Sequence, residues 1–188
     1  MLKIVTIPNS VLTSRTKKVE QFDGSLQRLV KDMDQTLKAQ VNPQGVGLAA
    51  SQVGFDLAVF IIRPSPNAKT EVFVNPKIIK VEAGILEDSG KRVKNPQGSK
   101  NKKKKHRLEG CLSIPKIWGH IIRSAKVYLE YQDLAGKTHK KWMTGFKALI
   151  VQHEVDHLKG VLFTQRALEQ NSQLFEEKDG ELKKLLTK

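Results

Sequence analysis

Residues 145–159 constrain the fold most, because a helical pattern of apolar residues there contains the motif His-Glu-Val-Asp-His at positions 153–157. Positions i and i+4 of a helix lie on the same face, so the imidazoles of His153 and His157 can converge on one metal ion. Three apolar residues share that side of the helix: Phe146, Leu149 and Ile150. We therefore expect a helix that faces the core and ends at Gly160. Two core histidines that have this spacing by chance are the alternative.

The rest of the chain changes its hydrophobic period several times. Apolar residues recur at steps of three and four from Ser25 to Gln40, which predicts an amphipathic helix. Short apolar or alternating runs predict strands at residues 3–7, 57–63, 71–80, 126–133 and 137–143, the last two joined by a hairpin turn. Residues 168–186 have few apolar anchors and predict a polar, exposed C-terminal helix. Because strands and helices do not alternate strictly, the expected fold class is α+β.

The length of 188 residues favours one domain with a substantial core. Cys111 is the only cysteine, so no intramolecular disulfide can form, and a reducing cytoplasm is the expected location. No apolar stretch approaches the roughly 18 residues that a membrane helix needs. The first residues have no long apolar region and no cleavage site of a leader. We therefore expect a cytoplasmic protein without membrane association.

The net charge of +14 suggests a basic module that binds nucleic acid and holds a structural metal. However, residues 91–107 hold nine Lys and Arg and no acid, so the rest of the chain carries about +5. This basic insert predicts a solvated loop. The insert either serves only to keep the surface soluble or steers the protein to a phosphate-rich partner such as the ribosome.

A catalytic divalent metal needs three protein ligands and an open fourth position. In a zinc peptidase of the His-Glu-x-x-His class, the third ligand is a downstream carboxylate or histidine. The candidate carboxylates all lie in the polar tail: Glu169, Glu176, Glu177 and Glu181. Upstream, Cys111 offers a thiolate, and with two imidazoles this soft donor suits Fe(II), Zn(II) or Co(II) rather than Mg or Ca. Glu154 would then lie next to the metal-bound water.

A glycine-containing segment at residues 45–52 is a third candidate site element. Its glycines let the backbone pass close to a ligand. The side-chain amide of Gln52 is a neutral donor that can stabilise an oxyanion. A phosphate-binding loop is disfavoured, because the segment lacks the Lys-Ser/Thr of a nucleotide loop and the third glycine of a dinucleotide loop.

Three motifs in this order resemble the signature of peptide deformylases: Gly-x-Gly-Leu-Ala-Ala-x-Gln, Glu-Gly-Cys-Leu-Ser and Gln-His-Glu-x-Asp-His-Leu. The resemblance extends from Val5 to Phe163. It implies a metal-dependent hydrolase that removes the N-formyl group from the N-terminal methionine of nascent polypeptides. It also implies an α+β fold in which antiparallel sheets pack around a central metal-binding helix, here followed by the C-terminal helix.

The resemblance also assigns roles to residues of this sequence. The implied metal ligands are Cys111, His153 and His157. The implied catalytic groups are Glu154 as acid and base, with the Gln52 amide and the Leu112 N–H binding the formyl oxygen. The implied substrate-binding residues are Val46, Gly47, Gly110, Phe146, Leu149 and Ile150. Fe(II) is the implied native ion, for which Zn(II), Ni(II) or Co(II) can substitute.

The sequence departs from the family pattern at two positions. Ser51 replaces the frequent Pro or Thr, and Trp118 replaces an Arg that helps to hold the substrate backbone in many members. We expect a catalytic domain at residues 1–165, with the basic insert inside it, and a helical tail at 166–188. We also expect Glu109 and Arg123 to pair and to orient His157, with a plain surface salt bridge as the alternative.

Overall fold

A computed structural model describes residues 1–86, 92–93 and 108–185 of the chain. The expected basic loop at 91–107 lies outside the described residues apart from 92–93, which form the short strand β4 (Arg92–Val93). Within the described part, no helix is both long and apolar enough to cross a membrane.

The larger sheet of the described chain has six antiparallel strands. Its main path is β1 (Gly47–Ala49), β2 (Val59–Ile62), β3 (Glu71–Leu86), β7 (Ser124–Gln132) and β8 (Thr138–Thr144), and β4 pairs with β3. The expected hairpin between β7 and β8 is confirmed, and its turn uses Gly136 at a φ of +79°. β3 continues six residues beyond the expected end at Lys80, because its C-terminal part still pairs with β7.

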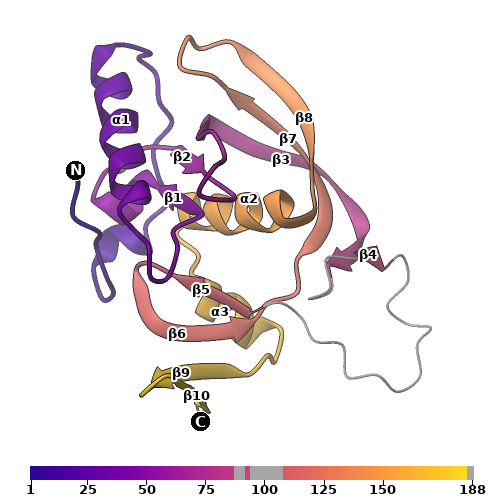
Figure 1. The fold of residues 1–188 in the computed structure, drawn as a ribbon. Helices are drawn as coiled ribbons and strands as arrows, with labels where there is room; N and C mark the ends of the chain where they lie inside the picture. The colour runs from indigo at the N-terminus through magenta and orange to yellow at the C-terminus, as the bar shows by residue number, and fades with distance from the viewer. Residues whose placement is uncertain (87–91, 94–107, 186–188) are drawn as a thin grey trace.

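The smaller sheet has four antiparallel strands in the order β10 (Glu181–Lys184), β9 (Leu174–Lys178), β6 (Ile114–His120) and β5 (Leu108–Cys111). Figure 1 shows the helix α2 (Gly145–Leu158) between this sheet and the larger one, with α3 (Phe163–Glu169) beside β6. The mixed α+β class with antiparallel sheets is therefore confirmed.

The helix α2 is held by apolar contacts with the larger sheet. The cluster that they form includes Ile150, Val151 and Val155 from the helix and Phe60, Phe73, Val127 and Leu129 from the strands, all nearly inaccessible to solvent. The expected helical segment at 145–159 is thus confirmed, and the chain leaves it at Gly160 with a φ of +72°. A Cβ at Gly160 would lie 2.5 Å from the carbonyl oxygen of Thr13, so the turn requires glycine.

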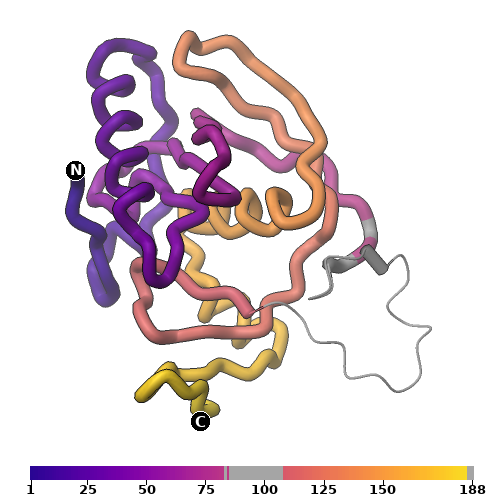
Figure 2. Tube along the Cα trace, viewed as in Figure 1, coloured from indigo at the N-terminus to yellow at the C-terminus, as the bar shows by residue number. Residues whose placement is uncertain are grey.

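The helix α1 (Gly24–Lys38) confirms the amphipathic helix expected at 25–40 and covers the other side of the larger sheet. The Asp23 carboxylate caps it by accepting hydrogen bonds from the backbone N–H groups of Ser25 and Leu26. Figure 2 shows the indigo N-terminal third of the chain on one side of the molecule and the yellow C-terminal hairpin at the bottom. Two short 3₁₀ helices, η1 (Ser10–Leu12) and η2 (Ala50–Val53), complete the elements of the described chain.

The prediction of a strand at residues 3–7 is wrong. Val5 N–H donates to the Gln52 carbonyl and Ile7 N–H donates to the Ser113 carbonyl. These two bonds go to different segments, so the extended chain joins no continuous strand and bridges η2 to the β5–β6 turn instead.

The prediction of a C-terminal helix at 168–186 is also wrong. The helix α3 ends at Glu169, and the chain then forms the hairpin β9–β10, in which β9 pairs with β6. The turn residues Asp179 and Gly180 both have positive φ, +54° and +78°, as a two-residue hairpin turn of the Asp-Gly type requires. Pairing with the edge of β6 outweighs the weak helical preference of this polar segment.

Candidate metal and catalytic site

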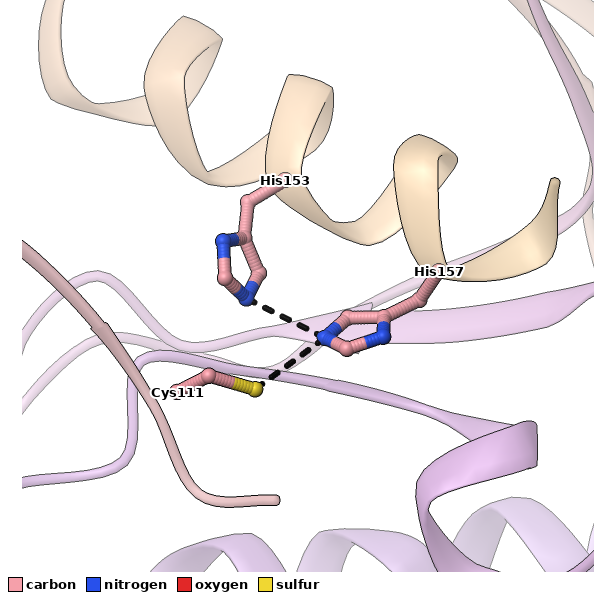
Figure 3. Close-up of side chains that lie close together, drawn as sticks. All are labelled: Cys111, His153 and His157. Atoms are coloured by element: carbon pink, nitrogen blue, oxygen red, sulfur yellow. Dashed lines mark hydrogen bonds between the residues drawn. The ribbon is translucent and has the colours of Figure 1, made fainter. Parts of the chain in front are cut away.

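The side chains of Cys111, His153 and His157 converge beneath α2 (Figure 3). The Cys111 Sγ lies 3.2 Å from His157 Nε2, which in turn lies 3.2 Å from His153 Nε2. All three donor atoms lie within 4.8 Å of one another, and they are the only group of this kind among the described residues.

This arrangement fits a divalent metal ion. Bonds of about 2.0–2.3 Å in a tetrahedral site separate neighbouring donor atoms by about 3.3–3.8 Å, close to the two distances of 3.2 Å that His157 Nε2 makes with the other donors. A soft thiolate with two imidazoles is a donor set for Fe(II), Zn(II) or Co(II). Three protein ligands also leave a fourth position open, as a catalytic rather than a structural site requires.

Two elements bring the ligands together. The histidines are one turn apart on α2, and His157 is 2% exposed. Cys111 lies at the end of β5, where the register with β6 shifts between Gly110, which faces Trp118, and Cys111, which faces Ile114. A bulge of this kind re-aims a side chain, and here the thiol points toward the helix.

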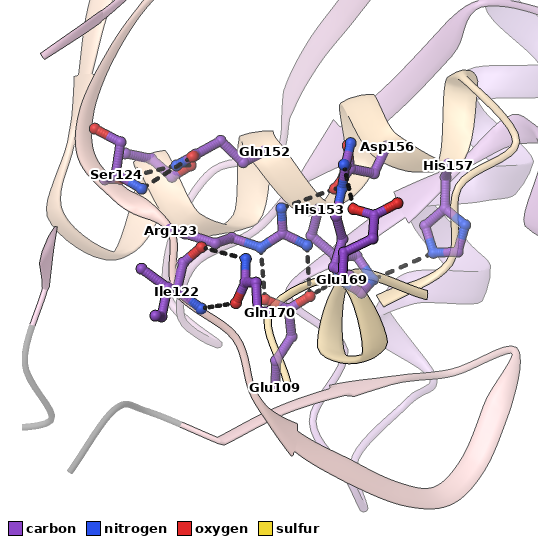
Figure 4. Close-up of polar contacts among 12 residues, drawn as sticks. Glu109, Ile122, Arg123, Ser124, Gln152, His153, Asp156, His157, Glu169 and Gln170 are labelled. Atoms are coloured by element: carbon purple, nitrogen blue, oxygen red, sulfur yellow. Dashed lines mark hydrogen bonds and ion pairs between the residues drawn. The ribbon is translucent and has the colours of Figure 1, made fainter. Parts of the chain in front are cut away.

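A carboxylate orients one of the histidines (Figure 4). The Glu109 Oε1 lies 2.6 Å from His153 Nδ1, which leaves Nε2 as the nitrogen that faces the other two ligands. Arg123 donates to both oxygens of Glu109, at 2.6 and 2.7 Å. The expected pairing of Glu109 with Arg123 is thus confirmed, but the prediction that it orients His157 is wrong. The reason is geometric, since the Glu109 carboxylate lies at Nδ1 of His153, whereas His157 Nδ1 has no hydrogen-bond partner among the described residues.

The same cation continues the network toward α3. Arg123 Nη1 donates to Asp156 Oδ2 at 2.9 Å, and Asp156 Oδ1 accepts from Arg166 Nη2 at 2.8 Å. The Arg123 side chain is only 6% exposed. Burial alone would raise the pKa of Glu109, but the bonds from Arg123 and the proximity of His153 outweigh it and lower that pKa to about 2. Glu109 therefore stays ionised as the partner of His153.

Glu154 lies next to the three donor residues and is not part of their cluster. Glu154 is 3% exposed and lines a cavity that Cys111 and His153 also line. Its Oε2 has no hydrogen-bond partner in the described part of the chain. Burial raises the pKa of Glu154 to about 7. A Cβ at Gly47 would lie 2.3 Å from Glu154 Oε1, so glycine at position 47 allows the strand β1 to approach the carboxyl group this closely.

The side chain of Gln52 also contacts Cys111. Its Oε1 accepts from the backbone N–H of Ala49 at 2.9 Å, which fixes the direction of the amide. Its Nε2 then donates to Cys111 Sγ at 3.3 Å and to Ser113 Oγ at 3.2 Å. The neutral amide group is thus held directly against the cluster.

A cavity of about 390 Å³ opens above these groups. The structure brings to its wall every site residue expected from the sequence except His157, which lies beneath it. These wall residues are Val46, Gly47, Gln52, Gly110, Cys111, Leu112, Phe146, Leu149, Ile150, His153 and Glu154.

Several wall residues were not expected from the sequence: Pro43, Gln44, Pro64, Leu108, Trp118 and Ile121. Trp118 was noted only as a departure from the family pattern, and β6, which carries it, was not predicted. The cue available was the run of apolar residues between Ile114 and Ile122.

The alternative carboxylate ligands of the tail have other partners or positions. Glu169 pairs with Arg166, Glu176 with Lys178, and Glu177 accepts from the indole of Trp118. Glu181 is exposed on β10. None belongs to the donor cluster found in the described chain, so the ligand set of a His-Glu-x-x-His zinc peptidase is not assembled here.

Comparison with known proteins gives one family throughout. The family model described as polypeptide deformylase matches residues 1–173. A peptide deformylase of Dictyoglomus turgidum is 35% identical over 178 residues, which cover 95% of this chain and 99% of that protein. One from Borreliella burgdorferi is 36% identical over 162 residues, covering 86% of this chain and 85% of the relative.

Solved structures give the same result. A plant peptide deformylase superposes with a TM-score of 0.74 at 31% identity, covering 90% of this chain and 82% of the plant chain. The peptide deformylase of Thermotoga maritima superposes with a TM-score of 0.72 at 30% identity, covering 88% and 97%.

Proposed function

Because the chain belongs to the polypeptide deformylase family, we propose that it removes the N-formyl group from the N-terminal methionine of nascent polypeptides. The reaction is hydrolysis of a linear amide. The observation that carries the proposal is the convergence of Cys111, His153 and His157 next to a cavity that the buried Glu154 also lines.

Cys111, His153 and His157 would hold one divalent ion on α2 and β5. When bound, such an ion lowers the pKa of a water molecule from 15.7 toward about 7 and so supplies hydroxide at neutral pH. We propose Fe(II) as the native ion and Zn(II), Ni(II) or Co(II) as substitutes, on the basis of the thiolate in the donor set and the family's usual metal.

Glu154 takes the proton of the attacking water and later delivers it to the leaving amine. Two observations support this role. The carboxyl group has a free oxygen in the cavity, and burial raises its pKa to about 7, where a group can both accept and release a proton near neutral pH.

The formyl oxygen becomes an oxyanion as the carbon is attacked. The Gln52 amide and the backbone N–H of Leu112 lie on the cavity wall beside Cys111 and would donate to this oxygen. One such donor is typically worth about 3 kcal/mol of transition-state stabilisation.

The methionine side chain would enter the apolar part of the cavity. Phe146, Leu149 and Ile150 project from the first two turns of α2 into this wall. The backbones of Val46, Gly47 and Gly110 line the opposite sides and would pair with the peptide. Because the formyl carbon carries only hydrogen, the close approach of Gly47 to Glu154 would exclude bulkier acyl groups.

Location and partners form a further part of the proposal. The single cysteine supports a cytoplasmic site of action, where nascent chains are made. The nine positive charges at 91–107 support contact with ribosomes through phosphate, which would be sensitive to salt.

The direct test is formate release from formyl-Met-Ala-Ser by protein purified without oxygen, together with metal analysis of the same sample. We expect one divalent ion per chain and turnover that is lost on chelation and restored by Fe(II) or Co(II). A fully metal-loaded protein that releases no formate would contradict the proposed function.

A further inference from the structure

A side-chain hydrogen bond joins the hairpin β9–β10 to a wall residue of the cavity. The indole Nε1–H of Trp118, on β6, donates to Glu177 Oε2, on β9, at 2.9 Å. The two strands pair with Trp118 opposite Phe175. Since side chains alternate along a strand, Glu177 lies on the same face as Phe175 and Trp118, whereas Glu176 lies on the opposite face.

The indole ring lies against the residue that precedes the cysteine ligand. A Cβ built on Gly110 would lie 2.7 Å from Cε3 and 2.8 Å from Cζ3 of Trp118. The ring therefore covers Gly110, and both residues line the same cavity. A peptide that leaves the cavity along the Gly110 backbone has to pass over or beside the indole.

Two further aromatic rings lie on the same face of the small sheet as Trp118. Phe175 meets the ring of His120 edge-on, with centroids 5.6 Å apart. His120 is two residues beyond Trp118 on β6, so its side chain lies on the same face as the indole. The side chains of Trp118, His120 and Phe175 therefore share one face of the small sheet, which runs from the cavity wall to β9.

We propose that Glu177 is a positioning residue for substrate binding, which holds the Trp118 indole as a platform for the peptide beyond the formyl-methionine. The platform takes the peptide planes and apolar side chains of the residues that follow the methionine. This inference rests on the proposed function. It assigns a role to the C-terminal hairpin, which begins at Leu174, one residue after the segment matched by the family model.

The expected kinetic effect follows from where the ring lies. Trp118 is outside the cluster of donor atoms, so its fixed orientation stabilises bound substrate and transition state alike. Loss of such uniform binding raises KM and leaves kcat unchanged. Loss of the hydrogen bond that fixes the ring should therefore raise KM about threefold to tenfold.

The test compares the metal-loaded protein with Glu177→Ala on formyl-Met-Ala and on formyl-Met-Ala-Ser-Val. We expect KM for the longer peptide to rise about threefold to tenfold. KM for the dipeptide should change less than that, and kcat should stay within about twofold for both peptides. Glu177→Gln keeps an oxygen that accepts from the indole and should restore the low KM. Glu176→Ala, on the opposite face of the same strand, is the matched control.

Trp118→Phe removes the same hydrogen bond from the other side while it keeps an aromatic ring. It should raise KM for the longer peptide as Glu177→Ala does, and the double variant should be no worse than either single one. It also serves as the test if Glu177→Ala does not fold.

Each other outcome overturns the inference. A KM for the longer peptide equal to that of Glu176→Ala would remove the positioning role and leave the proposed function intact. Equal losses on both peptides without rescue by Glu177→Gln would make the contact merely structural. If the intact metal-loaded protein hydrolyses neither peptide, the proposed function and the inference fail together.

Discussion

The helix α2 and the hairpin β9–β10 differ in what holds their polar side chains. On α2, Glu154, Asp156 and His157 are all less than 10% exposed, and Asp156 is bound by two arginines. On β10 every residue is exposed. Buried polar groups require hydrogen-bond partners within the protein or a functional role in a cavity, whereas exposed polar groups form hydrogen bonds with water. Substitutions should therefore matter far more in α2 and around it than in the hairpin.

The largest effect should come from the ligands. Cys111→Ser or His157→Ala removes one of three donors, so we expect the protein to lose its metal and essentially all turnover. Metal analysis after gel filtration measures this. His139→Ala, which removes a histidine that pairs with Asp133 outside the site, is the control. A Cys111→Ser protein that keeps a full equivalent of metal would show that the ligand set is wrong.

A smaller but still large effect should come from Glu154→Ala. The ion should stay bound, because Glu154 is not in the donor cluster. Turnover should fall at least about a hundredfold, the usual scale for a positioned acid and base. The measurement is kcat per bound metal. Loss of metal together with turnover would instead make Glu154 a ligand.

The buried network should affect stability rather than chemistry alone. Arg123→Met leaves Glu109 and Asp156 without their shared cation, and breaking a buried pair costs about 3–5 kcal/mol. Urea unfolding gives the change in free energy.

Lys17→Met is the control for that variant. It removes a cation from the pair with Asp56, whose side chains are 80% and 42% exposed, so the loss should be about 1 kcal/mol or less. If both variants lost the same stability, burial would not be the reason that the network matters.

The smallest effect should come from the hairpin turn. Gly180→Ala places a side chain at a φ of +78°, where the added Cβ meets no atom within 4 Å. Only backbone strain remains, so we expect a loss of about 1 kcal/mol. Glu181→Ala, the next residue in β10, should have less effect in the same urea titration. A loss as large as that of Arg123→Met would mean that the hairpin is as tightly coupled to the core as α2.

Local patterns in the sequence predicted the elements whose buried face repeats regularly. The helices at 25–40 and 145–159 and the hairpin of β7 and β8 are present with boundaries within two residues. The same patterns failed for β6 and β9, since few of their residues are fully buried and these two strands, which pair with each other, lie far apart in the sequence. The Asp179-Gly180 turn was a cue to the hairpin, but the polar residues around it favoured a helix.

By itself, the sequence determined the donor types and the residues at which they stand, because i, i+4 spacing on a helix fixes how His153 and His157 relate. It also determined that a single thiol was available as the third donor. Only the tertiary structure decided that Glu109 orients His153 rather than His157, and that Trp118 lies over Gly110 and donates a hydrogen bond to Glu177 on β9. The physical reason is the separation of the residues along the chain. Spacing within one helix depends only on neighbouring residues, whereas contacts between strands depend on how segments that are distant in the sequence pair.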